Sequence, residues 1–136
     1  MKTDKHMVEV LVRAFFHSYF TKASGVTSID ITMVQPITIK QILVKNIDNI
    51  AGDFNIKIAR AFAMINEVKV SEKLANPKSF AGATALIKHT LGGDKELYEF
   101  MVERYKYHFT QALSGTVEKI DIVNDTLLYE AMRCMK

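Results

Sequence analysis

Residues 20–31 of the chain read FTKASGVTSIDI, and residues 109–122 read FTQALSGTVEKIDI, which is nearly the same sequence. The two stretches align when Leu113 and one residue before the second IDI are treated as insertions. Each copy follows an aromatic-rich segment and contains a Ser-Gly pair. Glycine accepts the left-handed backbone conformation that residues with a Cβ resist, so each copy predicts a helix end followed by a short strand. The repeat could come from a duplication of the segment, or the same helix-capping sequence could have arisen twice independently.

Helical periodicity dominates the rest of the chain. Apolar residues recur every three or four positions over residues 5–23, 54–68, 79–91 and 95–112, and Asp94 is placed to cap the last of these helices. Residues 37–44 fit either a strand or a helix, and we favour the helix. Alternation over residues 29–33 predicts a strand that Pro36 either stops or places at the edge of a sheet, and a second strand is expected over residues 117–123.

These patterns together predict the fold class. We expect one globular domain over residues 1–136, of the α+β class but mainly helical. It would contain about six helices and a small sheet of two or three strands, with a helix-strand pseudo-repeat. At this length a chain can bury a full core without metals or disulfides.

Composition limits the function classes. The 136 residues include 18 basic and 15 acidic side chains, which gives a net charge of +3. The charges are scattered, so they permit nucleic-acid binding without arguing for it. The single cysteine, Cys134, cannot form an internal disulfide and fits a reducing compartment. The apolar runs are too short for a bilayer span and too interrupted for a signal peptide, so we expect a cytoplasmic protein without a membrane partner.

Residues 47–66, IDNIAGDFNIKIARAFAMIN, resemble a helix-turn-helix with its turn near Asn55. In that interpretation Lys57, Arg60 and Asn66 are the side chains that could contact DNA. Asn55 is less usual than glycine at such a turn, and the second helix would expose Ile58 where polar base-reading residues belong. An ordinary helical hairpin in the core is the competing interpretation.

The sequence contains no group of residues with the spacing of a known catalytic or metal-binding site. Asp30 and Asp121 would form an acid–base pair only if the two predicted strands paired, and outward-facing aspartates on strands are usually just solvated. The four histidines lack the paired spacing of zinc or di-iron sites. His108 lies in an aromatic segment that could line a ligand pocket or pack in the core. We therefore predict a protein that is not an enzyme and has no cofactor or metal.

The remaining prediction is a surface function. We expect a small interaction module, an adaptor, inhibitor or regulator, that binds a protein partner or a second copy of itself. Tyr98, Tyr105 and Tyr107 are the predicted interface residues, because tyrosine combines an apolar body with a polar tip. The alternative is a DNA-binding transcriptional regulator that uses residues 47–66.

Overall fold

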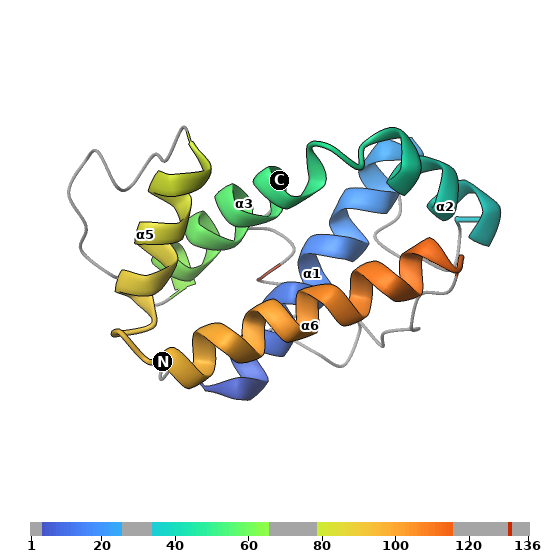
Figure 1. The fold of residues 1–136 in the computed structure, drawn as a ribbon. Helices are drawn as coiled ribbons and strands as arrows, with labels where there is room; N and C mark the ends of the chain where they lie inside the picture. Colours follow the sequence, from blue (N-terminus) through green and yellow to red (C-terminus); the bar gives the residue numbers. More distant parts are fainter. Residues whose placement is uncertain (1–3, 26–33, 66–78, 116–130, 132–136) are drawn as a thin grey trace.

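The computed structural model describes residues 4–25, 34–65, 79–115 and Ala131. The described residues form five helices, shown in Figure 1: α1 (Lys5–Ala23), α2 (Pro36–Lys45), α3 (Ile50–Ile65), α5 (Phe80–Thr90) and α6 (Lys95–Leu113). The described part of the chain is all-helical and contains no strand, so the predicted α+β class with a sheet and about six helices is wrong there. The predicted strands, residues 29–33 and 117–123, lie outside the described residues. An alternation of five residues does not define a strand without a partner to pair with.

Three of the helices begin at capping side chains. The side chain of Asp4 accepts a hydrogen bond from the backbone N–H of Met7 (2.9 Å) at the start of α1. Ser79 caps α5 in the same way, and Asp94 caps α6 as predicted. Pro36 was expected to end the predicted strand, which lies outside the described residues. Pro36 itself is the first residue of α2, where its missing N–H costs no helical hydrogen bond.

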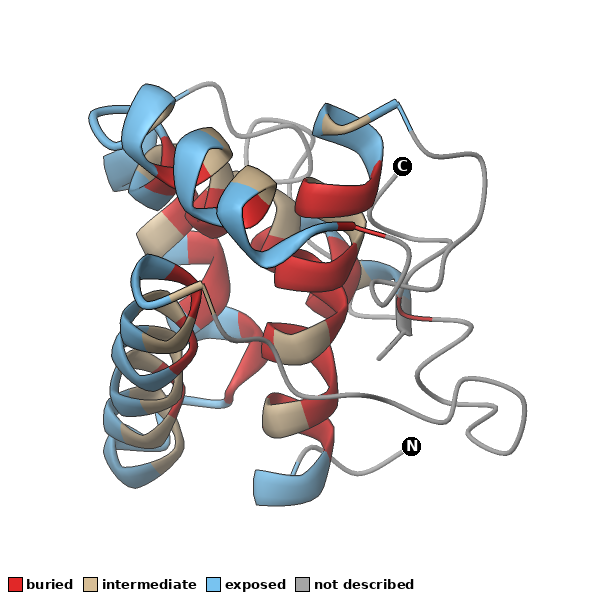
Figure 2. Cartoon of the chain, turned by 90° about the vertical axis from the view of Figure 1, so that its right-hand side faces the viewer, coloured by how far each residue is buried: buried red, intermediate tan, exposed pale blue. Residues whose placement is uncertain are grey.

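The helix α1 is central to the core. Buried residues occupy most of its sides, including Leu11, Phe15, Phe16 and Phe20. They belong to one hydrophobic cluster with residues of all the other described helices and with Ala131. Figure 2 shows the buried positions gathered where helices face one another and the exposed positions on the outer sides. A helix that is apolar nearly all round is stable only when other helices cover it.

The helices pack as two main pairs. α3 packs chiefly against α5, and α1 packs chiefly against α6, while α2 contacts the far part of α6. α1 and α6 run in the same direction, because Lys5 pairs with Glu96 and Glu9 pairs with Arg104 further along both helices. In Figure 1, α3 and α6 diverge and leave α1 between and behind them.

The helix-turn-helix predicted for residues 47–66 is not formed with its expected turn. Residues 54–56 lie inside α3, which is continuous from Ile50 to Ile65. The side chain of Asn55 donates a hydrogen bond to the carbonyl of Ala51 (2.8 Å), so it stays within the helix. Phe54 and Ile58 are both buried, which fixes one helical face through the predicted turn. The bend in the chain instead lies at residues 46–49, before α3 begins.

The repeated Ser-Gly pairs end α1 and α6 in the same way. Gly25 has φ +74° and Gly115 has φ +80°, so both adopt the predicted left-handed conformation. The hydroxyls of Ser24 and Ser114 each donate to the carbonyl three residues earlier, at 3.0 and 2.9 Å. The two helix ends therefore match in cap geometry as well as in sequence.

The two cap glycines offer a matched test of packing at the end of α6. Gly115→Ala should lower the free energy of unfolding by about 2 kcal/mol, and Gly25→Ala by about 1 kcal/mol. Both changes strain a left-handed residue. At position 115 the added Cβ would also lie 3.3 Å from the carbonyl oxygen of Pro36, whereas no described atom lies within 4 Å at position 25. Urea denaturation measures both losses, and equal losses would contradict the contact with Pro36.

Candidate functional site

Aromatic side chains from three helices form one connected row. The rings of Phe54 on α3 and Tyr105 on α6 are 4.4 Å apart, and Phe109 follows Tyr105 at 6.0 Å. On the other side, Phe15 of α1 links Phe54 at 5.2 Å to Tyr19 at 5.4 Å. Such tilted and edge-on ring pairs stabilise the packing beyond the area they bury. The row joins α3 to α6 across the space where the two helices diverge.

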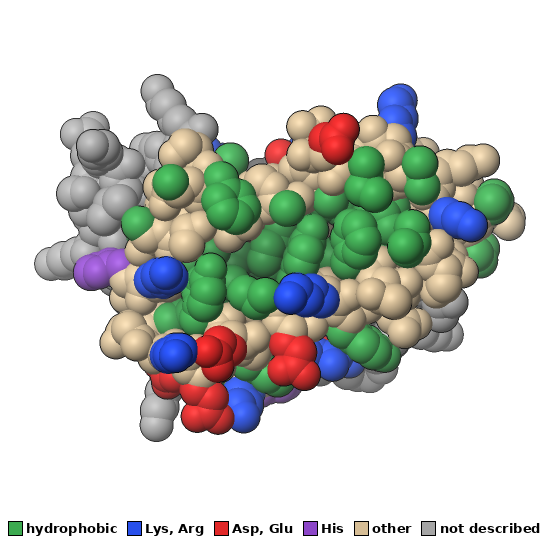
Figure 3. Space-filling view, in the orientation of Figure 1, with side chains coloured by type: hydrophobic (Ala, Val, Ile, Leu, Met, Phe, Trp, Pro, Cys, Tyr) green, Lys and Arg blue, Asp and Glu red, His purple; other side chains and the backbone are tan. Residues whose placement is uncertain are grey.

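This row lies in an open apolar groove. Figure 3 shows hydrophobic side chains gathered in a hollow between α3 and α6. Tyr19, Tyr105 and Phe109 are half-buried, and Phe54 is buried beneath them. We call Tyr19, Phe54, Tyr105 and Phe109 the aromatic groove. A contiguous apolar area of this kind on a folded chain commonly marks a binding surface.

The tyrosines of the groove keep their protons. Burial raises the pKa of Tyr105 to about 12, with a smaller contribution from Tyr19. Burial also raises the pKa of Tyr19, and the nearby carboxylate of Asp53 adds to the effect. Both hydroxyls are therefore neutral at physiological pH and can donate hydrogen bonds to a bound partner.

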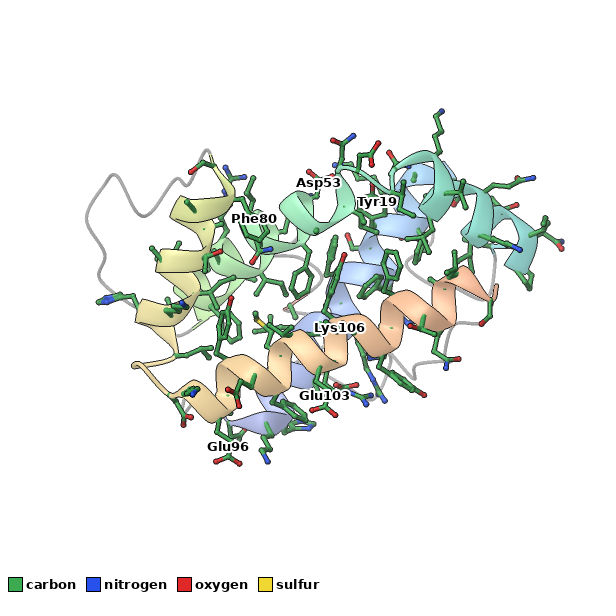
Figure 4. All side chains as sticks on the ribbon, in the orientation of Figure 1. Tyr19, Asp53, Phe80, Glu96, Glu103 and Lys106 are labelled. Carbon is green, nitrogen blue, oxygen red and sulfur yellow. The ribbon has the colours of Figure 1, made fainter. Side chains whose placement is uncertain are left out.

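Charged side chains lie at the edges of the aromatic groove. Figure 4 places Lys106 on α6 along its lower edge and Asp53 on α3 at its upper edge, with Tyr19 next to Asp53. Glu96 and Glu103 lie on α6 below the groove in the same view. The exposed ring of Phe80, with 56% of its surface accessible, lies at the α5 end.

The three tyrosines predicted as interface residues do not share one surface. Tyr98 and Tyr105 are both half-buried on α6 and pack against the core, and Tyr105 lies in the aromatic groove. Tyr107 is 38% exposed and carries the guanidinium of Arg104 over its ring at 4.3 Å. Of the three, only Tyr105 lies in the aromatic groove. Tyr19 could not be predicted as a groove residue, because its spacing along α1 is typical of an ordinary helix core.

Two residues of the DNA-binding alternative, Lys57 and Arg60, are neighbours on α3. Lys57 is half-buried on α3 and Arg60 is exposed one turn later. Asn66 lies outside the described residues, as do Asp30 and Asp121 of the acid–base hypothesis. The structure therefore describes two of the three proposed DNA contacts, and only Arg60 is fully at the surface.

A cluster of charged residues joins α1 to α6. Arg104 donates two hydrogen bonds to the carboxylate of Glu9, from Nε at 2.6 Å and from Nη2 at 2.9 Å. His108 Nε2 donates to the same carboxylate at 3.0 Å, and so does Arg13 Nε. The forked Arg–carboxylate geometry fixes both the distance and the rotation of the two helices.

The contacts of Glu9 shift the pKa of its carboxyl group. Burial by itself would raise the pKa of the Glu9 carboxyl, but hydrogen bonds from His108 and Arg104 outweigh burial and lower the pKa from 4.5 to about 2. Sequence reasoning missed this cluster. The four-residue spacings of Glu9 with Arg13 and of Arg104 with His108 were its visible signal, but spacing alone does not say that the two helices meet.

His108 is part of that cluster. Its ring is 7% exposed and packs 5.9 Å from Phe16. With Nε2 bonded to Glu9, the ring connects the aromatic core to the charged cluster. Among the described residues, no three His, Cys, Asp or Glu side chains are grouped closely enough to hold a metal ion.

Comparison with known proteins gives no relative from which a function could be transferred. No protein-family model, curated protein or solved structure matches the chain. None of the described helices is both long and apolar enough to cross a membrane.

The ion pair of Glu9 should make the free energy of unfolding depend on pH in the acidic range. Because the folded pKa lies below the unfolded value, its contribution is complete above about pH 4.5 and is lost as the pH falls towards 2. Glu9→Gln should lower the free energy of unfolding at pH 7 by about 3 kcal/mol and make the acid dependence shallower. Urea titrations at a series of pH values measure both effects.

The matched control is Glu103→Gln, which neutralises an exposed carboxylate on α6. It should change stability by no more than about 0.5 kcal/mol. An acid dependence in Glu9→Gln as steep as that of the unsubstituted protein would contradict the role of Glu9.

Proposed function

We propose that the protein is a cytoplasmic, non-enzymatic interaction module that binds an amphipathic helix of a protein partner in the aromatic groove. The observation that carries the proposal is the row of Tyr19, Phe54, Tyr105 and Phe109 at the base of an open hollow between α3 and α6. Tyrosines that are half-buried before binding can be fully buried by a partner at little cost in side-chain entropy, and they are enriched among the residues that dominate binding energy.

The shape of the groove favours a helix as its occupant. Its two walls are the helices α3 and α6, and its accessible floor consists of the half-buried rings of Tyr19, Tyr105 and Phe109. Phe15, Phe16 and Phe54 lie buried beneath them. An added helix would lay an apolar stripe on the floor and contact both walls, as in other helix-in-groove complexes. A strand would need a free sheet edge, and the described part of the chain has no strand.

The two edges of the groove differ in charge, with Lys106 on the α6 side and Asp53 on the α3 side, and the α6 side favours an acidic residue on the partner helix. Lys106 is exposed at the edge of the groove, and the whole chain carries a net charge of +3. An Asp or Glu next to the partner's apolar stripe would pair with Lys106, which selects the partner and its orientation more than it adds affinity. A nucleic acid would be attracted by the same charge, but the apolar floor of the groove offers no match to phosphates.

A helical peptide library displayed on yeast provides the test. Peptides selected on the full chain should carry apolar residues at positions i, i+3, i+4 and i+7 with neighbouring Asp or Glu. Their affinity should fall about tenfold for Lys106→Glu, because the substitution turns an attraction into a repulsion. Lys40→Glu, an exposed site on α2, has the same charge change and should leave the affinity unchanged.

Three further results would contradict the proposal. If selected peptides lack the helical pattern or bind Lys106→Glu equally well, the groove is not the binding surface. If sedimentation shows a dimer that Lys106→Glu dissociates, the occupant is a second copy of the chain. Binding to a random DNA duplex that weakens steeply between about 50 and 200 mM salt would favour the nucleic-acid alternative.

A further inference from the structure

The face of α6 that lines the aromatic groove continues beyond it towards the start of the helix. Tyr105 and Phe109 belong to the groove, and Val102 and Tyr98 lie one and two turns before Tyr105 on the same face. All four side chains are half-buried and pack against the hydrophobic core. Figure 3 shows hydrophobic side chains that continue from the hollow towards α5. From Tyr98 to Phe109 this apolar stripe is about 16 Å long, which corresponds to roughly three turns of a helix.

The helix α5 stands at the Tyr98 end of the stripe. The ammonium group of Lys88 on α5 lies 5.2 Å from the centre of the Tyr98 ring on α6. Phe80 precedes Lys88 by about two turns on the same side of α5, and α5 packs closely against α3. Figure 1 shows α5 beside the end of α3 and the start of α6. The groove between α3 and α6 is therefore bounded by α5 at one end.

Phe80 is the exposed aromatic residue at this end of the groove. It begins α5, and 56% of its surface is accessible. A single exposed apolar side chain needs no explanation. Phe80 differs because Figure 4 places it on the side of α5 that faces the hollow, where the apolar surface is continuous. A partner that covers the ring there removes apolar area from water and gains an aromatic contact.

The spacing along α5 suits the width of one helix. Phe80 and Lys88 are separated by eight residues of α5, which span about 12 Å. A helix with its side chains is about 10 to 12 Å wide. The end of one helix therefore fits between Phe80 and the contact of Lys88 with Tyr98. A flat or extended partner would leave much of this width uncovered.

We infer that the partner helix of the proposed function, on which this step rests, extends along α6 to Tyr98 and ends at α5 between Phe80 and Tyr98. Its apolar stripe covers about three turns, and Lys106 lies beside the middle of that stripe, where an acidic residue of the partner pairs with it. Phe80 and Tyr98 then determine specificity. They favour helices with a large apolar residue at the α5 end over helices that stop one turn earlier, because aromatic residues dominate the energy of such contacts.

The test uses the tightest-binding helical peptide selected on the full chain and two shortened forms of it, each without the last turn at one end. Phe80→Ala should weaken binding of the complete peptide about tenfold. It should not change the affinity of the form that lacks the α5 end, because that form no longer reaches position 80. Ile37→Ala is the matched control, since Ile37 is 60% exposed near the start of α2. It should leave every affinity unchanged.

A nitroxide spin label on the peptide gives a second measurement that requires no substitution in the protein. With the label at one end of the peptide, the NMR signals of the amides of Phe80 and Tyr98 should broaden in the ¹⁵N-labelled full chain. With the label at the other end, the signals of Tyr19 and Phe109 should broaden. The end that broadens Phe80 also shows in which direction the partner helix runs.

The outcomes separate this inference from the proposed function. A peptide can bind in a way that depends on Lys106 while Phe80→Ala leaves its affinity unchanged, or while neither label broadens the signals of Phe80 and Tyr98. Either result would mean that the partner helix stops short of α5, and only the inference would be wrong. If no helical peptide binds the chain, the inference and the proposed function are both wrong.

Discussion

The carboxylate of Glu9 sets how α1 and α6 are placed against each other. It lies between α1 and α6 with 17% of its side chain exposed, and it receives hydrogen bonds from Arg13, Arg104 and His108. Apolar packing alone would leave these two helices free to slide or rotate by a turn at modest cost. The bidentate contact with Arg104 removes that freedom, because its hydrogen bonds are made at one register only.

The aromatic groove follows from this register. α6 is held against α1, α3 is held mainly by α5, and the space between α3 and α6 is bridged chiefly by the ring of Tyr105 on Phe54. A chain with one more helix in that space would have a closed core. Here the rings of Tyr19, Tyr105 and Phe109 stay partly exposed, and the tyrosine hydroxyls make this exposure to water tolerable. The same helices that complete the core elsewhere thus define the walls of an unfilled site.

The sequence predicted helices well and their assembly poorly. The period of apolar residues located α1 and α6, and Asp94 and the Ser-Gly pairs marked where helices begin and end, because caps are determined by local backbone chemistry. The prediction of a turn at Asn55 was wrong. Burial of Phe54 and Ile58 on one helical face stabilises the helix, whereas Asn55 only tolerates a turn and does not require one. The partners of Glu9 could not be predicted, since the contacts lie almost a hundred residues apart along the chain. Of the candidate groove, the sequence supplied Tyr105 and missed Tyr19.

The parallel pairing of α1 with α6 also shapes how the chain can fold. Two helices that run in the same direction cannot be joined by a short turn, so the intervening helices must carry the chain back before α6 can dock. The contacts of Glu9 with Arg104 and His108 span 95 and 99 residues. Closing so long a loop is entropically costly and slows folding. During synthesis the aromatic side chains of α1 therefore stay uncovered until α6 has been made. In this interval the chain is most prone to aggregate.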